Sequence, residues 1–227
     1  GTLWTEEILM GFRPVPPYVV QQAGNTFSGL EYEIIVAALR AAGHSVKPIA
    51  LPLGRLVQTF RKGTLQAAAP ILPSTNSGGT LSDVYLVYNN VAMVMKSSKL
   101  KPGRIADLKG LSIVAFQTAT KALGPEFAAV VEGNALYREE AEQVTQLRLH
   151  LHRRVDEGIG DSRILNHFIK APQTGVDSTL GVEEFRLFPP TNYRVAFRDP
   201  RHASDFNRGL ATIRKNGVYD SILARYR

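Results

Sequence analysis

The first 70 residues alternate between short apolar runs and helical patterns, and this alternation constrains the fold more than any other feature of the chain. The run ILMGF at residues 8–12 is typical of a buried strand, and the rigid turn PVPP closes it. A helix is expected from Gly29 to Ala42, because apolar residues recur at helical spacing, Ser28 can cap its start and Gly43 can end it.

A second set of the same elements follows at once. Residues 46–50 form another strand pattern, and Pro52 opens a helix in which Leu56 and Phe60 recur at helical spacing. Residues 65–70 then return as a third strand. Because parallel strands need crossover connections, this βαβαβ order predicts an α/β fold with a mostly parallel sheet and helices on its faces.

The alternation starts again after the polar loop PSTNSGG at residues 73–79. We expect a helix around residues 164–169, strands over residues 90–95, 112–116, 135–137, 157–160 and 193–197, and helices over residues 205–216 and 218–226. The last strand and helices can return to complete the first sheet. This predicts a monomer of two lobes with a ligand cleft between them, formed by residues 1–92 with 195–227 and by 93–194, with hinge strands near 91–96 and 193–197.

Composition and motifs exclude several classes of function. The formal net charge of +7 raises the question of nucleic acid, but Lys and Arg are scattered, so no nucleic-acid partner is expected. The five histidines are also scattered, and the pair at residues 150 and 152 does not share a helix face. No nucleophile elbow, phosphate loop or cysteine is present, so we predict no metal, no cofactor and no enzymatic activity.

The start of the chain leaves two interpretations open. No basic and apolar leader opens the sequence, and its first residue is Gly1. We expect a mature exported protein whose signal peptide has been removed, and a chain trimmed at its ends is the alternative. The lack of cysteine fits both, because a chain of 227 residues does not need disulfides to fold.

Eight segments in order resemble the periplasmic solute-binding proteins of the amino-acid type, the group that includes the glutamine-binding protein. The segments are GFRPVPPYV, SGLEYEIIVAAL, FRKGTLQAAAPI, LSDVYL, IADLKGLSIVAFQTAT, RRVDEGIGDSRILNHFIK, NYRVAF and IRKNGVYDSILARY. The resemblance implies a two-lobed type II periplasmic-binding fold, located in the periplasm of a Gram-negative type of cell. It also implies closure on a small polar ligand, amino-acid-like or amine-bearing, which is presented to a membrane ABC permease.

Two aspartates in the sixth segment carry the site that the resemblance implies. Asp161 falls where members place the carboxylate that receives a ligand's ammonium group, and a carboxylate suits this role because it only accepts hydrogen bonds. The alternative is that Asp161 only caps the helix that starts at Ser162. Asp156 matches a family position that is more often structural.

The usual anchor for an α-carboxylate is missing. Family members place Thr and then Arg in the loop after the third strand, and here the Arg position falls on glycine. Arg13 or Arg55 could replace it through a bidentate pair, although exposed arginine is common. Together, the predicted ligand-binding residues are Arg13, Tyr18, Leu53, Arg55, Pro70, Thr75, Phe116, Gln117, Thr118, Thr120 and Asp161.

Some of these residues have a structural alternative. Tyr18 could form an aromatic wall for a ligand, but an aromatic beside a proline turn more often packs in the core. The segment from Gln117 to Thr120 precedes a helix, whose exposed N–H groups would favour an anionic group of a ligand, and ordinary capping by threonine is the alternative. Phe116 stands where the glutamine-binding protein has a basic residue, so the site is expected to be less polar there.

Two other functions remain open on the same fold. The domain could belong to a membrane sensor kinase or cyclase, in which closure sends a signal instead of delivering a solute. It could also be an enzyme of the cyclohexadienyl-dehydratase type, since some members of the fold class use one carboxylic acid for that reaction. Asp161 or Glu157 could then be that acid.

Overall fold

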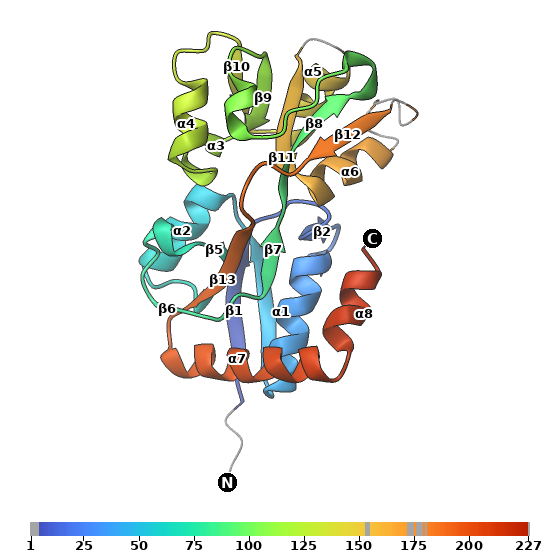
Figure 1. Cartoon of the computed structure of the whole chain (residues 1–227). Helices are drawn as coiled ribbons and strands as arrows, with labels where there is room; N and C mark the ends of the chain where they lie inside the picture. Colours follow the sequence, from blue (N-terminus) through green and yellow to red (C-terminus); the bar gives the residue numbers. More distant parts are fainter. Residues whose placement is uncertain (1–4, 153–154, 172–174, 176–178, 180, 227) are drawn as a thin grey trace. The chain divides into compact units, whose positions relative to one another are not determined.

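In the computed structural model the chain folds into two compact units, of which the first is built from two separate stretches of sequence (Figure 1). The structure describes residues 5–152, 155–171, 175, 179 and 181–226. The first unit contains the chain up to Val87 and from Asn192 onward, and the second contains Tyr88–Thr191. The sequence prediction places the two divisions at residues 92 and 195.

The first unit is a sheet with helices on both faces. Its strands are β4 (Ser45–Ala50), β1 (Glu7–Phe12), β5 (Ala67–Ile71), β13 (Thr191–Phe197) and β6 (Thr80–Leu81), in that order, with β7 (Leu86–Tyr88) also paired to β13. Strands β4, β1 and β5 are parallel, whereas β13 runs antiparallel to β5 and β6. A small antiparallel hairpin accompanies the sheet and is formed by β2 (Val20–Gln22) and β3 (Thr26–Ser28).

Side chains along β1 point alternately to the two faces of the sheet, and each face packs against different helices. Phe12 points toward α1 (Leu30–Ala41), where its ring centre lies 5.4 Å from that of Tyr32. Gly11 points to the other face, where Leu56 of α2 (Leu53–Arg61) lies against it. Helix α7 (Pro200–Lys215) packs along α1, and α8 (Val218–Ala224) follows it (Figure 1). A short 3-10 turn, η1 (Pro73–Thr75), follows β5.

The second unit is also a sheet covered on both faces. Its strand order is β10 (Tyr137–Glu140), β9 (Ile113–Phe116), β11 (Glu157–Asp161), β8 (Asn90–Met95) and β12 (Val182–Phe185). The first three strands are parallel, and β8 and β12 are antiparallel to their neighbours. The remaining elements are η2 (Lys96–Ser98), η3 (Ile105–Leu108), α3 (Ala119–Ala122), α4 (Pro125–Val131), α5 (Gln143–Leu151) and α6 (Ser162–Lys170).

The two faces of this second sheet carry different apolar clusters. Ile113 and Ile159 pack on one face with side chains of η3 and α4, such as Phe127. Val91 and Met93 pack on the other face with side chains of α5 and α6. The alternation of side chains along a strand explains this division. In the part of the chain that the structure describes, no helix is long and apolar enough to cross a membrane.

The fold class predicted from sequence is confirmed, with several local differences. The N-cap of α1 is Gly29 and not Ser28. Glycine is required at this position, because its φ is 115° and a Cβ there would lie only 2.3 Å from the Tyr18 carbonyl oxygen. Helix α7 begins earlier than predicted, since Pro200 occupies its first turn and the Asp199 side chain accepts the Arg201 N–H. Strand β10 lies two residues later than predicted, and the polar strand β12 had no counterpart in the prediction.

Candidate functional site

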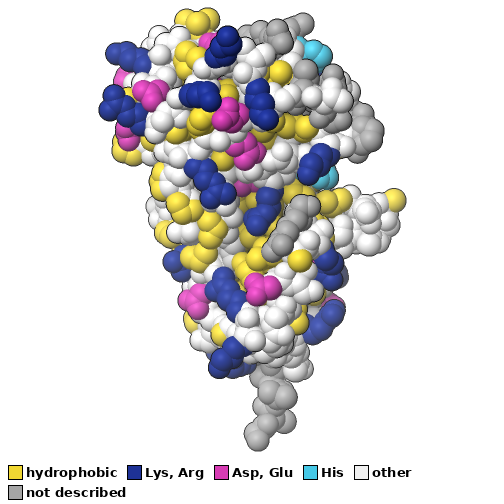
Figure 2. Space-filling model, turned by 45° about the vertical axis from the view of Figure 1, so that its right-hand side comes forward, with side chains coloured by type: hydrophobic (Ala, Val, Ile, Leu, Met, Phe, Trp, Pro, Cys, Tyr) yellow, Lys and Arg dark blue, Asp and Glu magenta, His cyan; other side chains and the backbone are white. Residues whose placement is uncertain are grey.

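Polar and charged side chains of both units lie at the carboxyl ends of the parallel strands. This is the edge at which open α/β sheets bind ligands. The predicted residues Arg13, Tyr18, Leu53, Arg55, Pro70 and Thr75 belong to the first unit, and Phe116, Gln117, Thr118, Thr120 and Asp161 belong to the second. In the view of Figure 2, Lys and Arg side chains are spread over the surface with Asp and Glu among them, and no single basic patch stands out.

Arg13 follows β1 directly. Its backbone N–H donates to the Ala69 carbonyl over 3.2 Å, and its half-buried guanidinium carbon lies 6.0 Å from the centre of the Tyr193 ring. The positive charge of Arg13 also acts on the carboxylate of Glu31. The structure therefore brings Arg13, Tyr193 and Glu31 together within the first unit.

Glu31 is a buried acid in the first turn of α1 that the sequence prediction missed. Its Oε2 accepts a hydrogen bond from the Tyr85 hydroxyl over 2.7 Å. Burial raises the pKa of Glu31 to about 7, and the Tyr85 hydrogen bond and the Arg13 charge offset this rise only in part. Helical spacing could have found this residue, because Glu31 stands three and four positions before the buried Ile34 and Ile35.

The other predicted residues of the first unit differ in exposure. Tyr18 is 1% exposed, and its carbonyl accepts the Glu31 N–H over 2.9 Å, so the packing alternative describes its position in this unit. Pro70 is buried in β5 behind a cis peptide bond. Leu53 and Arg55 lie in the first turn of α2 and are both exposed.

The loop that lacks the family's arginine is held by a different arginine. Arg61, at the end of α2, donates from Nη2 to the Thr75 carbonyl over 2.9 Å and to the Asn76 carbonyl over 2.7 Å. Asn76 adopts a left-handed conformation with φ 52°. The backbone of Thr75 is therefore held in position by the hydrogen bonds from Arg61, and Thr75 is half-buried.

Asp161 is the last residue of β11 and the N-cap of α6. Its Oδ2 accepts the Ile164 N–H over 3.1 Å, and its Oδ1 accepts the Asn89 N–H over 3.0 Å. The side chain is almost fully buried, with the residue 4% exposed. The structure thus contains the helix cap that the sequence offered as an alternative, and the same carboxylate also connects α6 to the segment before β8.

Asp156 has a separate structural role. Its Oδ2 accepts the Ser112 N–H over 3.0 Å, and its own N–H donates to the Ser112 hydroxyl over 2.7 Å. This reciprocal pair joins the start of β11 to the start of β9, which agrees with the structural role predicted for Asp156.

The amide groups before α3 are occupied by a side chain of the protein. The backbone N–H groups of Thr118 and Thr120 donate to the two carboxylate oxygens of Glu139 over 2.9 Å and 3.1 Å. Burial alone would raise the pKa of Glu139, but hydrogen bonds from Tyr137, Thr120 and Thr118 outweigh it and lower the pKa. These N–H groups are therefore not available to an anionic ligand as the sequence suggested, because Glu139 already supplies the negative charge.

The remaining predicted residues of the second unit lie at the end of β9. Phe116 is half-buried and packs against the cluster of that face. Gln117 is exposed, and its N–H donates to the Glu140 carbonyl over 3.1 Å. Phe116 and Gln117 therefore lie at the same carboxyl edge of the sheet as the hydrogen bonds of Glu139.

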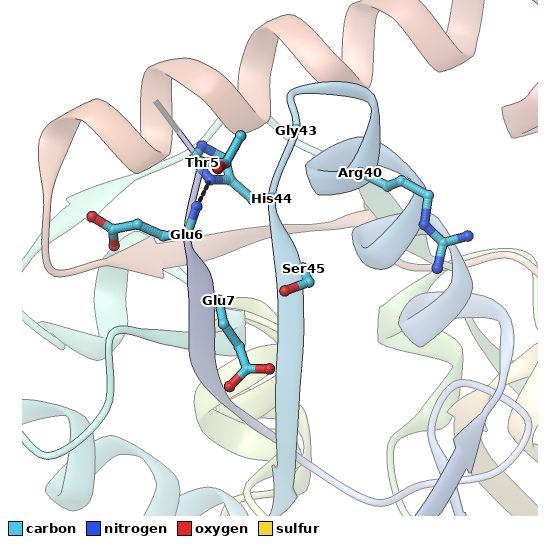
Figure 3. A pocket seen from close by; sticks show the side chains of 7 residues that line it. All are labelled: Thr5, Glu6, Glu7, Arg40, Gly43, His44 and Ser45. Carbon is cyan, nitrogen blue, oxygen red and sulfur yellow. Dashed lines mark hydrogen bonds between the residues drawn. The ribbon is translucent and has the colours of Figure 1, made fainter. Parts of the chain in front are cut away.

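A separate hollow lies at the opposite, amino edge of the first sheet (Figure 3). Its volume is about 430 Å³, and its lining includes Glu6, His44 and Arg40. His44 accepts the Glu6 N–H at Nδ1 over 2.9 Å, and its Nε2 contacts Asp205 over 2.7 Å. The two ring nitrogens together connect the residue before β1 to α7, which is a structural use of this histidine. No group of three or more His, Cys, Asp or Glu within the described ranges is arranged to hold a metal ion.

Comparisons with solved structures show the same fold. An ancestral arginine-binding protein bound to arginine matches with a TM-score of 0.76 at 17% identity, covering 99% of both chains. A histidine kinase sensor domain with similarity to periplasmic binding proteins has a TM-score of 0.78 at 16% identity, covering 97% of this chain and 95% of that one.

An ancestral amino acid-binding protein described as a precursor of cyclohexadienyl dehydratase gives a TM-score of 0.74 at 18% identity, covering 97% of this chain and 94% of that one. At these identities the likeness shows the fold and nothing finer. No curated protein sequence matches the chain.

A family model describes nearly the whole chain. It matches residues 8–227, so it includes both units and all the strand ends described above. The resemblance predicted from the sequence is thereby confirmed. The chain belongs to the bacterial extracellular solute-binding proteins, family 3.

Proposed function

We propose that the chain binds a small polar, amine-bearing solute of the amino-acid type in a Gram-negative periplasm and presents it, as a monomer, to a membrane ABC permease. Membership of the extracellular solute-binding family supports binding of a small solute outside the cytoplasm. A structure of the same fold is an arginine-binding protein bound to arginine, which supports an amino-acid-like ligand.

The observation that carries this proposal is the carboxylate of Asp161 at the end of β11. It is buried and held by two backbone N–H groups, so its position is set before any ligand arrives. A carboxylate oxygen can accept more than one hydrogen bond, so the role of Asp161 as a helix cap is compatible with a role in receiving a ligand's ammonium group.

Asp161→Asn is expected to weaken binding of amino acids and amines by at least about 30-fold, or roughly 2 kcal/mol, because a desolvated charge partner is lost. Asparagine is as good an N-cap as aspartate, so α6 should keep its first turn. Calorimetric titration of the parent and the variant, scaled to the folded fraction measured by circular dichroism, gives the comparison.

Asp156→Asn is the matched control, because it removes the same charge at the other end of β11. It should weaken the Ser112 pair and lower stability slightly while leaving the affinity per folded molecule unchanged. If Asp161→Asn binds every amino acid and amine as tightly as the parent, Asp161 is only a helix cap and the proposed ammonium site does not exist.

We further propose that Arg13 replaces the missing carboxylate anchor. It is half-buried at a strand end, whereas Arg55 is exposed on a helix. Arg13→Ala should therefore weaken an amino acid at least about tenfold more than the corresponding decarboxylated amine, since only the amino acid loses a paired charge. Arg55→Ala should weaken both ligands equally or not at all. A selective loss in Arg55→Ala instead would assign the anchor to Arg55.

The two alternative functions are addressed by different measurements. The sensor function has support at the level of fold from the histidine kinase sensor domain, and the full-length gene decides it by showing whether a membrane segment and a kinase or cyclase follow. The enzyme function predicts turnover on incubation with prephenate-like acids. For that function Glu157 is a poor candidate, because it lies at the amino end of β11, away from the strand edge that carries Asp161.

A further inference from the structure

The second unit buries two titratable side chains that no other side chain neutralises. Glu157 is the first residue of β11, and His150 lies in the last turn of α5. Both residues are 0% exposed. In the described part of the chain, neither carboxylate oxygen of Glu157 has a hydrogen-bond partner, and the ring of His150 has only the backbone of Asp156 beside it, outside good hydrogen-bond geometry.

The strand register places these groups on opposite faces of the sheet. Glu157 stands opposite Val94 of β8 and Ile113 of β9, so its side chain shares their face. That face is the one packed under η3 and α4. His150 contacts the other face, where a Cβ at Gly158 would lie 3.4 Å from its ring. The absence of a side chain at Gly158 makes room for the histidine.

Few charges lie near either group. Asp156 precedes Glu157, and its charge acts on both Glu157 and His150. Half-buried Glu183 of β12 stands opposite Val94 on the Glu157 side. The other ionisable residues on the elements packed against these two groups are at least partly exposed and comprise Asp107, Glu126, Arg148, Arg163, His167 and Lys170. None of them forms a described ion pair with Glu157 or His150, so both groups experience mainly desolvation.

Desolvation has opposite consequences for an acid and a base. Burial raises the pKa of Glu157 to about 7, with a further rise from the charge of Asp156, so the folded protein keeps a proton there. Burial lowers the pKa of His150 to about 4, and the neighbouring Asp156 reverses this only in part, so the folded protein excludes a proton there. In an unfolded chain, Glu and His titrate near their ordinary values, about 4.3 and about 6.5.

These shifts give opposite slopes of stability against pH. The native state holds the Glu157 proton that the unfolded chain has released, so this group costs stability as pH rises from about 4.5 to about 7. The unfolded chain binds a proton at His150 that the native state excludes, so this group costs stability as pH falls from about 6.5 to about 4. The two windows overlap almost completely.

We propose that Glu157 and His150 form an opposed pair, in which each group offsets the pH dependence that the other gives to the stability of the second unit between about pH 5 and about pH 8. Half-buried His167 of α6, whose pKa burial also lowers, adds to the effect of His150. Because β11 begins with Glu157 and ends with Asp161, the pair limits how much the order of the strand that bears Asp161 changes across this range. The proposal does not depend on which ligand Asp161 binds, or on whether it binds one.

Amide hydrogen exchange of the full chain at pH 5 and pH 8 tests the pair. Each rate for β8 and β11 is divided by the chemical exchange rate at that pH, which gives an opening constant. Relative to the parent, the ratio of this constant at pH 8 to that at pH 5 should be about 70-fold lower in Glu157→Gln and about 30-fold higher in His150→Leu, given the pKa values of the removed groups.

Matched controls remove the same kinds of group at positions that are less buried. Glu183→Gln changes a half-buried acid on the same sheet face as Glu157, and His152→Asn changes the exposed C-cap histidine of α5. Both should behave like the parent. The proposal fails if Glu157→Gln and His150→Leu shift the pH dependence in the same direction, or if neither differs from the parent.

A second measurement serves if Glu157→Gln does not fold. Glu157→Met then replaces it, because Val94 and Ile113 provide apolar surroundings for methionine. The infrared carbonyl band of protonated carboxylic acid is compared between the parent and this variant at pH 6. The parent should show one additional protonated carboxyl group, and equal bands would overturn the proposal, since Glu157 would then be ionised in the folded protein.

Discussion

Gly209→Ala is expected to destabilise the first unit by at least about 3 kcal/mol, although it adds one methyl group. Gly209 lies in α7 where this helix packs along α1. A Cβ at this position would lie 1.8 Å from the carbonyl oxygen of Ala38 and 2.8 Å from its carbonyl carbon. Because both atoms belong to the backbone, no rotation of a side chain can relieve the clash, and the two helices must move apart.

Gly54→Ala is the control for this change. Gly54 lies near the start of α2, and apart from its chain neighbours and the backbone of its own helix no described atom would come within 4 Å of a Cβ added there. Alanine should therefore stabilise the protein there by roughly 0.5–1 kcal/mol, as it does at exposed helix positions. Urea unfolding followed by circular dichroism measures both variants, and a Gly209→Ala protein as stable as the parent would show that α1 and α7 are not packed this closely.

Glu31→Gln should stabilise the first unit at pH 8 by about 3 kcal/mol, and this gain should vanish near pH 4. The folded state raises the pKa of Glu31 to about 7, above its unfolded value, so stability is fully present at low pH and is lost as pH rises through the interval up to about 7. Glutamine has no charge to desolvate, and its side-chain oxygen can still accept the Tyr85 hydroxyl.

Glu33→Gln, two residues further along the same helix, provides the contrast. Glu33 accepts hydrogen bonds from the Arg225 guanidinium over 2.9 Å and from the Tyr226 hydroxyl, so it is a paired, half-buried acid. Its replacement should lower stability at pH 8. Urea unfolding at pH 4, 6 and 8 separates the two variants, and a Glu31→Gln protein that keeps the parent's pH dependence would refute the buried, protonated state of Glu31.

Helices with a regular apolar face could be predicted from sequence because the spacing itself encodes burial. Helix α1 spans Leu30–Ala41, within one residue of the predicted bounds at each end, and Leu30, Ile34 and Ala38 are buried as expected. Strand β8 has the predicted bounds, since five apolar residues in a row, Val91 to Met95, leave no solvent-exposed face.

Strands at the edges of the second sheet were harder to predict. Strand β10 has the sequence YREE and β12 has VEEF, so both present polar side chains that are typical of loops. Their pairing depends on the neighbouring strands β9 and β8, and a single sequence does not contain that information locally.

Prediction of the candidate site was limited in the same way, because contacts between distant segments are not encoded locally in the sequence. The family resemblance indicated Asp161, and the segment from Gln117 to Thr120 was indicated because helix starts have local signatures. The sequence did not indicate that Glu139 fills the amide groups before α3, since this depends on the register that aligns Glu139 with Ala115 of β9. Nor did it indicate that Glu157 is left without a partner, because this depends on which side chains surround it.

The order in which the first unit receives its strands has a consequence for biosynthesis. Strand β13 lies between β5 and β6 in the sheet, yet it follows the whole second unit in the chain. A ribosome working at about 5–20 residues per second must add roughly 100 residues after β6 before β13 exists. During that interval the apolar strand β5 has an open edge, of the kind that promotes aggregation. The continuous second unit is able to fold first, and the β13 side of β5 stays unpaired until β13 emerges.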